Sequence, residues 1–104
     1  MFGLFKRNKQ VCNRFVTCYF VCSKDDVNQF MDIHQIPAIS NGRSFFLLES
    51  DAVDYIKARR DTQQVVLVLR VPENLIQFLP DNTTLCLCKS VVNMDQCYQK
   101  TIFV

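Results

Sequence analysis

Apolar residues run almost unbroken from Val65 to Val71, and Arg70 is the single charge among them. Successive side chains of a strand point to opposite faces, so a strand with one wet face alternates apolar and polar residues. This run is apolar at both sets of positions. It therefore predicts an interior strand over residues 64–71 that is covered on both faces and ends at Pro72.

A second run with two apolar sides spans residues 11–22 and predicts another central strand. Ser23, which follows it, is typical of a helix N-cap, and the acids that come next suit the first turn of a helix. Helical spacing of i, i+3, i+4 and i+7 then relates Val27, Phe30, Met31 and His34. We expect a helix over about residues 24–34 that ends before Pro37.

The rest of the chain predicts further short elements. Ser50 is a second candidate N-cap, for a helix that carries acids early and bases late, as the helix dipole prefers. The expected elements are a strand at 43–49, a helix at about 51–60, a short helical segment at 73–79, a strand at 83–92, a hairpin turn at 93–96 and a closing strand at 97–104. The closing strand mixes polar and apolar residues, which suits the edge of a sheet.

This order, β-α-β-α-β-α-β-β, predicts an α+β (mixed α/β) fold. We expect one domain over residues 11–104, in which two main helices and one short helix pack on a central sheet of about five strands. The alternating first half favours crossover connections, and the last two strands favour an antiparallel hairpin. We expect residues 1–10 to be a separate flexible or anchoring tip.

Charge is unevenly distributed along the chain. The net charge is +2 from 12 basic and 10 acidic residues, and three of the basic residues fall in the first ten positions. The remaining 9 basic and 10 acidic residues balance, so no nucleic-acid partner is expected. The chain has only two glycines, which argues against a glycine-rich phosphate-binding loop. No apolar run approaches the roughly 20 residues of a membrane span, and no signal peptide is evident. We therefore expect a cytoplasmic location.

The N-terminal tip is apolar first and basic afterwards. It contains the candidate contact residues Phe2, Leu4, Phe5, Lys6, Arg7 and Lys9. Such a tip could contact a partner or the surface of an anionic membrane, with residues 1–9 as a peripheral contact. The alternative is a frayed terminus or one that packs back on the domain.

Six cysteines lie at positions 12, 18, 22, 86, 88 and 97. Without an export signal, reduced thiols are expected. A metal site would need Cys86 and Cys88 to meet Cys97 or His34, but paired short Cys-x-x-Cys spacings typical of zinc are absent. We expect these cysteines to pack as small apolar groups and expect no metal or cofactor. His34 is the one histidine; it suits a helix terminus better than a catalytic role.

The segment from residue 17 to 75 resembles ADP-ribosyltransferase-like domains. The resemblance rests on Tyr19 to Ser23, the capped helix, Phe45 to Ser50 with Ala52 and Tyr55, and the strand from Val65 to Val71. Members of that family place His or Arg on the first strand, where this chain has Phe20 or a neighbour, and a catalytic Glu for which this chain offers no match. The resemblance implies that fold with loss of activity.

Two functions follow as hypotheses. The first is a non-catalytic protein-interaction module with a protein partner or a homo-oligomer, in which the edge strand at 97–104 extends the sheet. The second is a nucleotide-related enzyme or ligand-binding domain, whose pocket would be lined by Tyr19, Arg43 or Glu73 at strand ends. No residue is assigned a catalytic role, and the balance leans against an enzyme.

Overall fold

The fold is α+β, as predicted, in a computed structural model that describes residues 14–104. Its main sheet has six strands in the order β5-β6-β3-β1-β4-β8, and a two-stranded sheet pairs β2 with β7. The elements are β1 (Phe15–Ser23), α1 (Lys24–Ile33), β2 (Gln35–Ile36), β3 (Arg43–Phe46), α2 (Glu49–Arg59), β4 (Gln64–Pro72), the 3₁₀ turn η2 (Glu73–Leu75), β5 (Ile76–Phe78), β6 (Leu85–Cys88), β7 (Val92–Asn93), α3 (Met94–Cys97) and β8 (Tyr98–Phe103).

The predicted interior strand at 64–71 is confirmed. β4 pairs antiparallel with β1 along its whole length, from Gln64 opposite Ser23 to Pro72 opposite Phe15. Residues 65–69 are all buried, because one side chain set faces α1 and the other faces α2. Arg70 is exposed, and its guanidinium carbon lies 4.5 Å from the centre of the Phe15 ring. The charge at the end of the strand is therefore accommodated at the surface.

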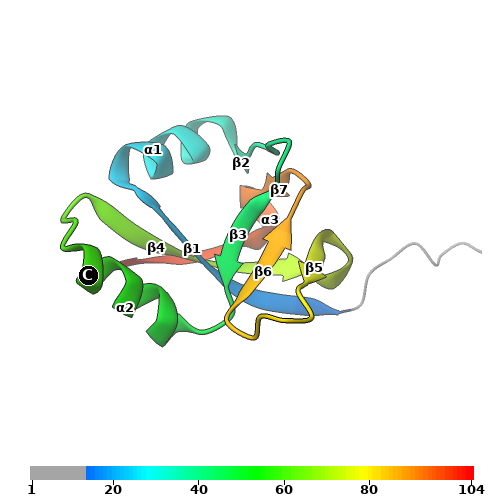
Figure 1. The fold of residues 1–104 in the computed structure, drawn as a ribbon. Coiled ribbons are helices and arrows are strands. Elements are labelled where there is room, and N and C mark those ends of the chain that lie inside the picture. Colours follow the sequence, from blue (N-terminus) through cyan, green and yellow to red (C-terminus); the bar gives the residue numbers. More distant parts are fainter. Residues whose placement is uncertain (1–13) are drawn as a thin grey trace, which may run out of the picture.

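Helices cover the two faces of the sheet unequally (Figure 1). The first face carries α1, α3 and the small sheet, and its core is the larger one. Phe20 lies at the centre of that core, with ring centroids 5.2 Å from Phe45 and 6.3 Å from Phe30. On the second face, α2 inserts Ala52 and Ile56 against the sheet. The fold thus has three layers, a helix on each side of the sheet, only where α1 and α2 lie opposite each other.

One of the two predicted helix caps is confirmed, and the other is wrong. The Ser23 Oγ accepts a hydrogen bond from the Asp26 backbone N–H at 3.0 Å, and α1 begins directly after it. Ser50, in contrast, lies inside α2. That helix begins at Glu49 after Leu48, and no side chain caps it. The acids of its first turn, Glu49 and Asp51, still oppose the positive end of the helix dipole.

The second half of the chain differs most from the expectation. The segment predicted as a short helix forms only the turn η2 before it becomes strand β5. The predicted hairpin turn at 93–96 is instead most of the helix α3, capped by the Asn93 side chain. Consequently β8 does not return along β6 but crosses the sheet to pair with β4. All strand pairs of the described residues are antiparallel, so the crossovers expected in the first half do not produce parallel pairs.

Candidate functional site

β8 forms one edge of the main sheet, as predicted for the closing strand. Its inner side pairs with β4, and no strand in residues 14–104 pairs with its outer side. In an antiparallel ladder alternate residues turn their N–H and C=O groups away from the neighbouring strand, so β8 presents backbone donors and acceptors outward. The opposite edge, β5, has three residues against six in β8. β8 is therefore the longer open edge.

Apolar side chains are exposed at the end of β8. Phe103 is 71% exposed and Val104 is 48% exposed. Near the middle of the strand, Lys100 supplies the single charge, and lysine on an edge strand discourages indiscriminate sheet pairing. The exposed apolar residues thus lie at one end of the molecule, beyond that lysine.

A cleft separates β8 from α1 on the first face of the sheet. This α1 cleft has a volume of about 260 Å³ and is lined by Lys24, Val27, Asn28, Val65, Thr101 and Phe103. Val27, Val65 and Phe103 make it largely apolar, and Lys24 is its one charge. A partner's side chain that entered this cleft from the outer side of β8 would contact mainly apolar side chains.

A second cleft lies beside the end of β8 on the other face. This α2 cleft has a volume of about 310 Å³ and is lined by Ile56, Lys57, Arg60, Asp61, Thr62 and Val104. Two cations and one acid line it. Arg60 ends α2 with a positive φ of 56°, a left-handed conformation that favours glycine. The chain thus places a strained arginine at the mouth of this cleft.

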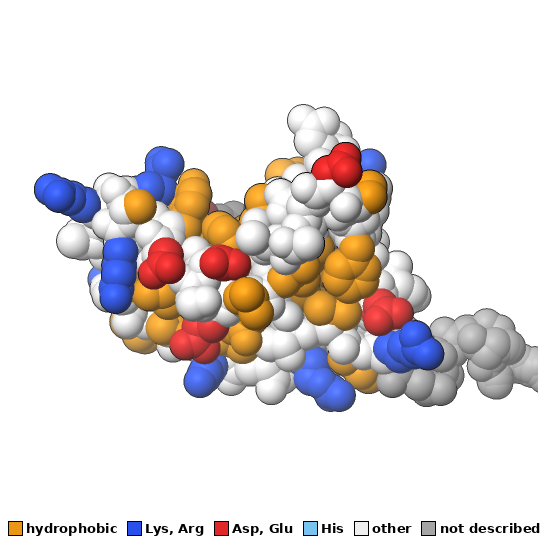
Figure 2. Space-filling model, turned by 60° about the horizontal axis from the view of Figure 1, so that its bottom comes forward, with side chains coloured by type: hydrophobic (Ala, Val, Ile, Leu, Met, Phe, Trp, Pro, Cys, Tyr) orange, Lys and Arg blue, Asp and Glu red, His pale blue; other side chains and the backbone are white. Residues whose placement is uncertain are grey.

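The two clefts share one basic end of the molecule. The Lys24 backbone N–H donates to the Gln63 carbonyl at 2.9 Å, which joins the start of α1 to the loop that follows α2. Figure 2 shows basic side chains gathered at the left, where α2 ends, with acidic and hydrophobic side chains beside them. The end of β8 is therefore flanked by Lys24 on one face and by Lys57 and Arg60 on the other.

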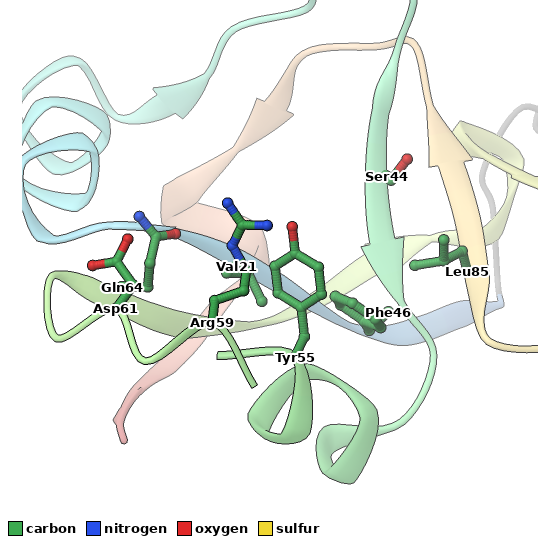
Figure 3. A pocket seen from close by; sticks show the side chains of 8 residues that line it. All are labelled: Val21, Ser44, Phe46, Tyr55, Arg59, Asp61, Gln64 and Leu85. Atoms are coloured by element: carbon green, nitrogen blue, oxygen red, sulfur yellow. The ribbon is translucent and has the colours of Figure 1, made fainter. Parts of the chain in front are cut away.

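A third hollow, the Tyr55 pocket, lies between α2 and the second face of the sheet (Figure 3). Its volume is about 310 Å³. Three apolar residues line it, Val21, Phe46 and Leu85. The other lining residues carry polar groups: Ser44, Tyr55, Arg59, Asp61 and Gln64. The Tyr55 ring centroid lies 5.5 Å from that of Phe46, and the Arg59 guanidinium carbon lies 5.2 Å from the Tyr55 ring. The three side chains thus lie in a row, with the guanidinium over the Tyr55 ring.

Five buried thiols form the other notable group. Cys18, Cys22, Cys86, Cys88 and Cys97 are all buried and form no disulfide. A hydrogen bond between the Cys18 and Cys86 thiols raises the pKa of Cys18 and lowers that of Cys86, and burial adds to the rise at Cys18. Burial likewise raises the pKa of Cys88 and Cys97, and raises that of Cys22 to about 12. The thiols pack as apolar groups, as predicted.

The described residues show neither a cluster of metal-binding side chains nor a helix that could span a membrane. Within residues 14–104, no group of three or more His, Cys, Asp or Glu side chains is arranged to hold a metal ion. His34 lies away from the thiols, at the surface, where its Nδ1 is 3.0 Å from the Asp95 Oδ1 and its left-handed backbone ends α1. No helix in this part of the chain is both long and apolar enough to cross a membrane.

The three predicted ligand residues lie on separate parts of the fold. Tyr19 is half-buried on the second face, beside the core that α2 covers. Arg43 lies on the first face, where its Nε donates to the Pro37 carbonyl at 2.8 Å and its guanidinium lies over two phenylalanine rings. Glu73 begins η2 and is 4.0 Å from the Arg14 guanidinium. None of them lines the three hollows, so their role in ligand binding stays a prediction.

The tip residues Phe2, Leu4, Phe5, Lys6, Arg7 and Lys9 lie outside the described residues, and their contacts stay a prediction. No family model, no curated protein and no solved structure matches this chain. The resemblance to ADP-ribosyltransferase-like domains and the cytoplasmic location also stay predictions. The features of this chain that bear on its function are therefore the β8 edge, the two clefts beside it and the Tyr55 pocket.

Two features escaped sequence reasoning. The exposure of Phe103 was not foreseen, because an alternating strand does not reveal which of its faces a helix leaves open. The Tyr55 pocket brings together residues from β1, β3, α2, β4 and β6, and their contact depends on a strand order that was not predicted. Arg59 and Arg60 are adjacent in the sequence, yet they line different hollows.

Proposed function

We propose that this domain is a non-catalytic protein-interaction module that binds an extended segment of a partner protein along β8. The observation that carries the proposal is the exposed Phe103 at the open edge of the sheet, between the α1 and α2 clefts. Strand addition at a sheet edge takes affinity from main-chain hydrogen bonds and specificity from pockets for alternate side chains. β8 supports both.

The geometry favours a particular partner. Side chains of an added strand alternate between the two faces of the sheet. One set would approach the α1 cleft, whose lining is mainly apolar, and the other would approach the α2 cleft with Lys57 and Arg60. Asp61 lies there too, but the two cations outnumber it. We therefore infer a segment in which an apolar residue is followed by an acidic one.

The test uses extended peptides of about ten residues selected from a random display library on the whole protein. We expect the selected peptides to alternate apolar and acidic residues, and we expect Phe103→Asp to weaken their binding at least about tenfold, because it removes the contact of a large apolar side chain and adds a repelling charge. Phe78→Asp is the matched control, since Phe78 is 50% exposed on the opposite edge strand.

Two results would contradict the proposal. Equal loss of binding in the Phe103 and Phe78 variants would place the interaction elsewhere or reflect a general effect of charge. Alternatively, concentration-dependent dimers of the wild type in sedimentation, absent in Phe103→Asp, would show that β8 serves a second copy of this chain and not a different partner.

A further inference from the structure

The Tyr55 pocket contains two opposite charges that form no ion pair with each other. Arg59 and Asp61 both line it. The two ion pairs between described residues lie elsewhere, at Arg14–Glu73 and His34–Asp95. The Asp61 Oδ1 instead accepts the Gln63 backbone N–H at 2.9 Å, and the Arg59 guanidinium lies over the Tyr55 ring. Each charged group thus has a contact with its surroundings, and each retains hydrogen-bonding capacity.

The stack on Tyr55 prepares Arg59 for an anion. A guanidinium that lies over an aromatic ring still presents its N–H fork, whose spacing matches a carboxylate. In Figure 3 the Arg59 guanidinium and the Tyr55 hydroxyl point to the same side of the pocket. A carboxylate between them would accept hydrogen bonds from both. Because Tyr55 is itself packed on Phe46, little side-chain freedom would be lost on binding.

The remaining lining residues define the rest of the ligand. Along the pocket in Figure 3, Asp61 and Gln64 lie to one side of Arg59, and Phe46 and Leu85 lie to the other side, beyond Tyr55. The order is therefore an acid, a guanidinium with a hydroxyl, and an apolar wall. A ligand complementary to it has an amine, a carboxylate and an apolar group in that order.

We propose that the Tyr55 pocket binds a free α-amino acid with an apolar side chain. The ammonium group pairs with Asp61, the carboxylate with Arg59 and the Tyr55 hydroxyl, and the side chain packs on Phe46 and Leu85. The pocket volume of about 310 Å³ lies at the lower end of the range of small-molecule sites, about 300–1,000 Å³, which suits a ligand of this size. The Tyr55 pocket shares Asp61 with the α2 cleft, but this proposal does not rest on the proposal for β8.

The experiment is an NMR titration of the whole protein with three probes that share a ring. L-phenylalanine carries both charges, 3-phenylpropionate lacks the amine, and 2-phenylethylamine lacks the carboxylate. L-leucine is included to vary the apolar group. We expect L-phenylalanine or L-leucine to produce saturable shifts in residues of the Tyr55 pocket with Kd of about 1 mM or below. If neither amino acid does so at about 10 mM, the proposal is overturned.

Two variants then separate the charges. Arg59→Gln should weaken L-phenylalanine and 3-phenylpropionate about tenfold, and leave 2-phenylethylamine unchanged. Asp61→Asn keeps the acceptor for the Gln63 N–H and should weaken L-phenylalanine and 2-phenylethylamine only. Lys57→Gln is the matched control, because Lys57 lies on the same helix end but lines the α2 cleft. If Lys57→Gln weakened each probe as much as Arg59→Gln does, the effect would reflect general electrostatics and the assignment would be overturned.

Discussion

Phe103 and Val65 are direct neighbours across β8 and β4, yet Val65 is 1% exposed and Phe103 is 71% exposed. Both side chains point to the face that α1 covers. The cover ends at β4, because α1 reaches Val65 through Val27 but leaves the α1 cleft open above Phe103. The outermost strand thus continues the apolar face of the core beyond the helix that buries it.

This difference in burial predicts that truncating the two side chains changes the free energy of unfolding by different amounts. Val65→Ala should lower the free energy of unfolding by about 2 kcal/mol, because it removes buried methyl groups and leaves a cavity. Phe103→Ala should change it by no more than about 0.5 kcal/mol, as for other exposed positions. Urea denaturation followed by circular dichroism measures both values. A large loss of stability in the Phe103 variant would show that its side chain serves the fold rather than binding.

Arg60 allows stability and binding to be separated. Glycine adopts the left-handed conformation of this position without steric cost, whereas arginine does not. Arg60→Gly should therefore leave the free energy of unfolding unchanged or raise it by up to about 1 kcal/mol, while it weakens acidic peptides selected on β8. Thermal melts and peptide titrations provide the two readouts.

The matched control for Arg60→Gly is His34→Gly. His34 ends α1 with a similar φ of 61° but does not line either cleft beside β8. This variant should bind the selected peptides as the wild type does. If both variants lost binding equally, the loss would have to come from the helix ends and not from the charge of Arg60.

Local patterns predicted several elements of the first half of the chain. Three features depend only on neighbouring residues in the sequence and could therefore be predicted from it. They are the strand from Val65 to Val71, the cap at Ser23 and the helix that follows this cap. The pairing of β8 with β4 could not be predicted, because it joins residues that lie 29 to 38 positions apart in the chain, from Leu69 with Tyr98 to Val65 with Phe103. Nothing local distinguishes a strand that returns along β6 from one that crosses the sheet.

The candidate surfaces were less predictable for the same reason. The edge position of the closing strand followed from its mixed polarity, and the structure bears it out. The charges around it did not follow, since Lys24 and Arg60 meet at one end only because β1 and β4 pair in register. Similarly, the stack of Phe46, Tyr55 and Arg59 could not be predicted, because it needs β3 and α2 to be in place.

The two serines that both suited an N-cap can be compared directly. Ser23→Ala removes the acceptor for the Asp26 N–H and should cost about 1 kcal/mol of unfolding free energy. Ser50→Ala should cost nothing measurable or stabilise slightly, because Ser50 lies within α2, where alanine is the better helix former. Chemical denaturation of the two variants checks this, and equal costs would contradict the cap assignment.

The raised pKa of Cys22 predicts how stability depends on pH. Its pKa rises from 9.0 to about 12, chiefly because the thiol is buried, with the Asp26 carboxylate adding to the effect. The unfolded chain therefore releases this proton at a lower pH than the folded one. Below pH 9 both states hold the proton and the full stability is present. As pH rises from about 9 toward 12, the unfolded state is favoured by up to about 1.4 kcal/mol per pH unit from this one group.

Removing the thiol should flatten that decline. We expect Cys22→Ala to be less stable than the wild type at pH 7, since it leaves a small cavity, and we expect the difference to shrink as pH rises above 9. The measurement is urea denaturation at several pH values from 7 to about 10.5, where other groups that titrate in both proteins cancel in the difference. A difference that stays constant over this range would mean that the folded thiol ionises as readily as the unfolded one.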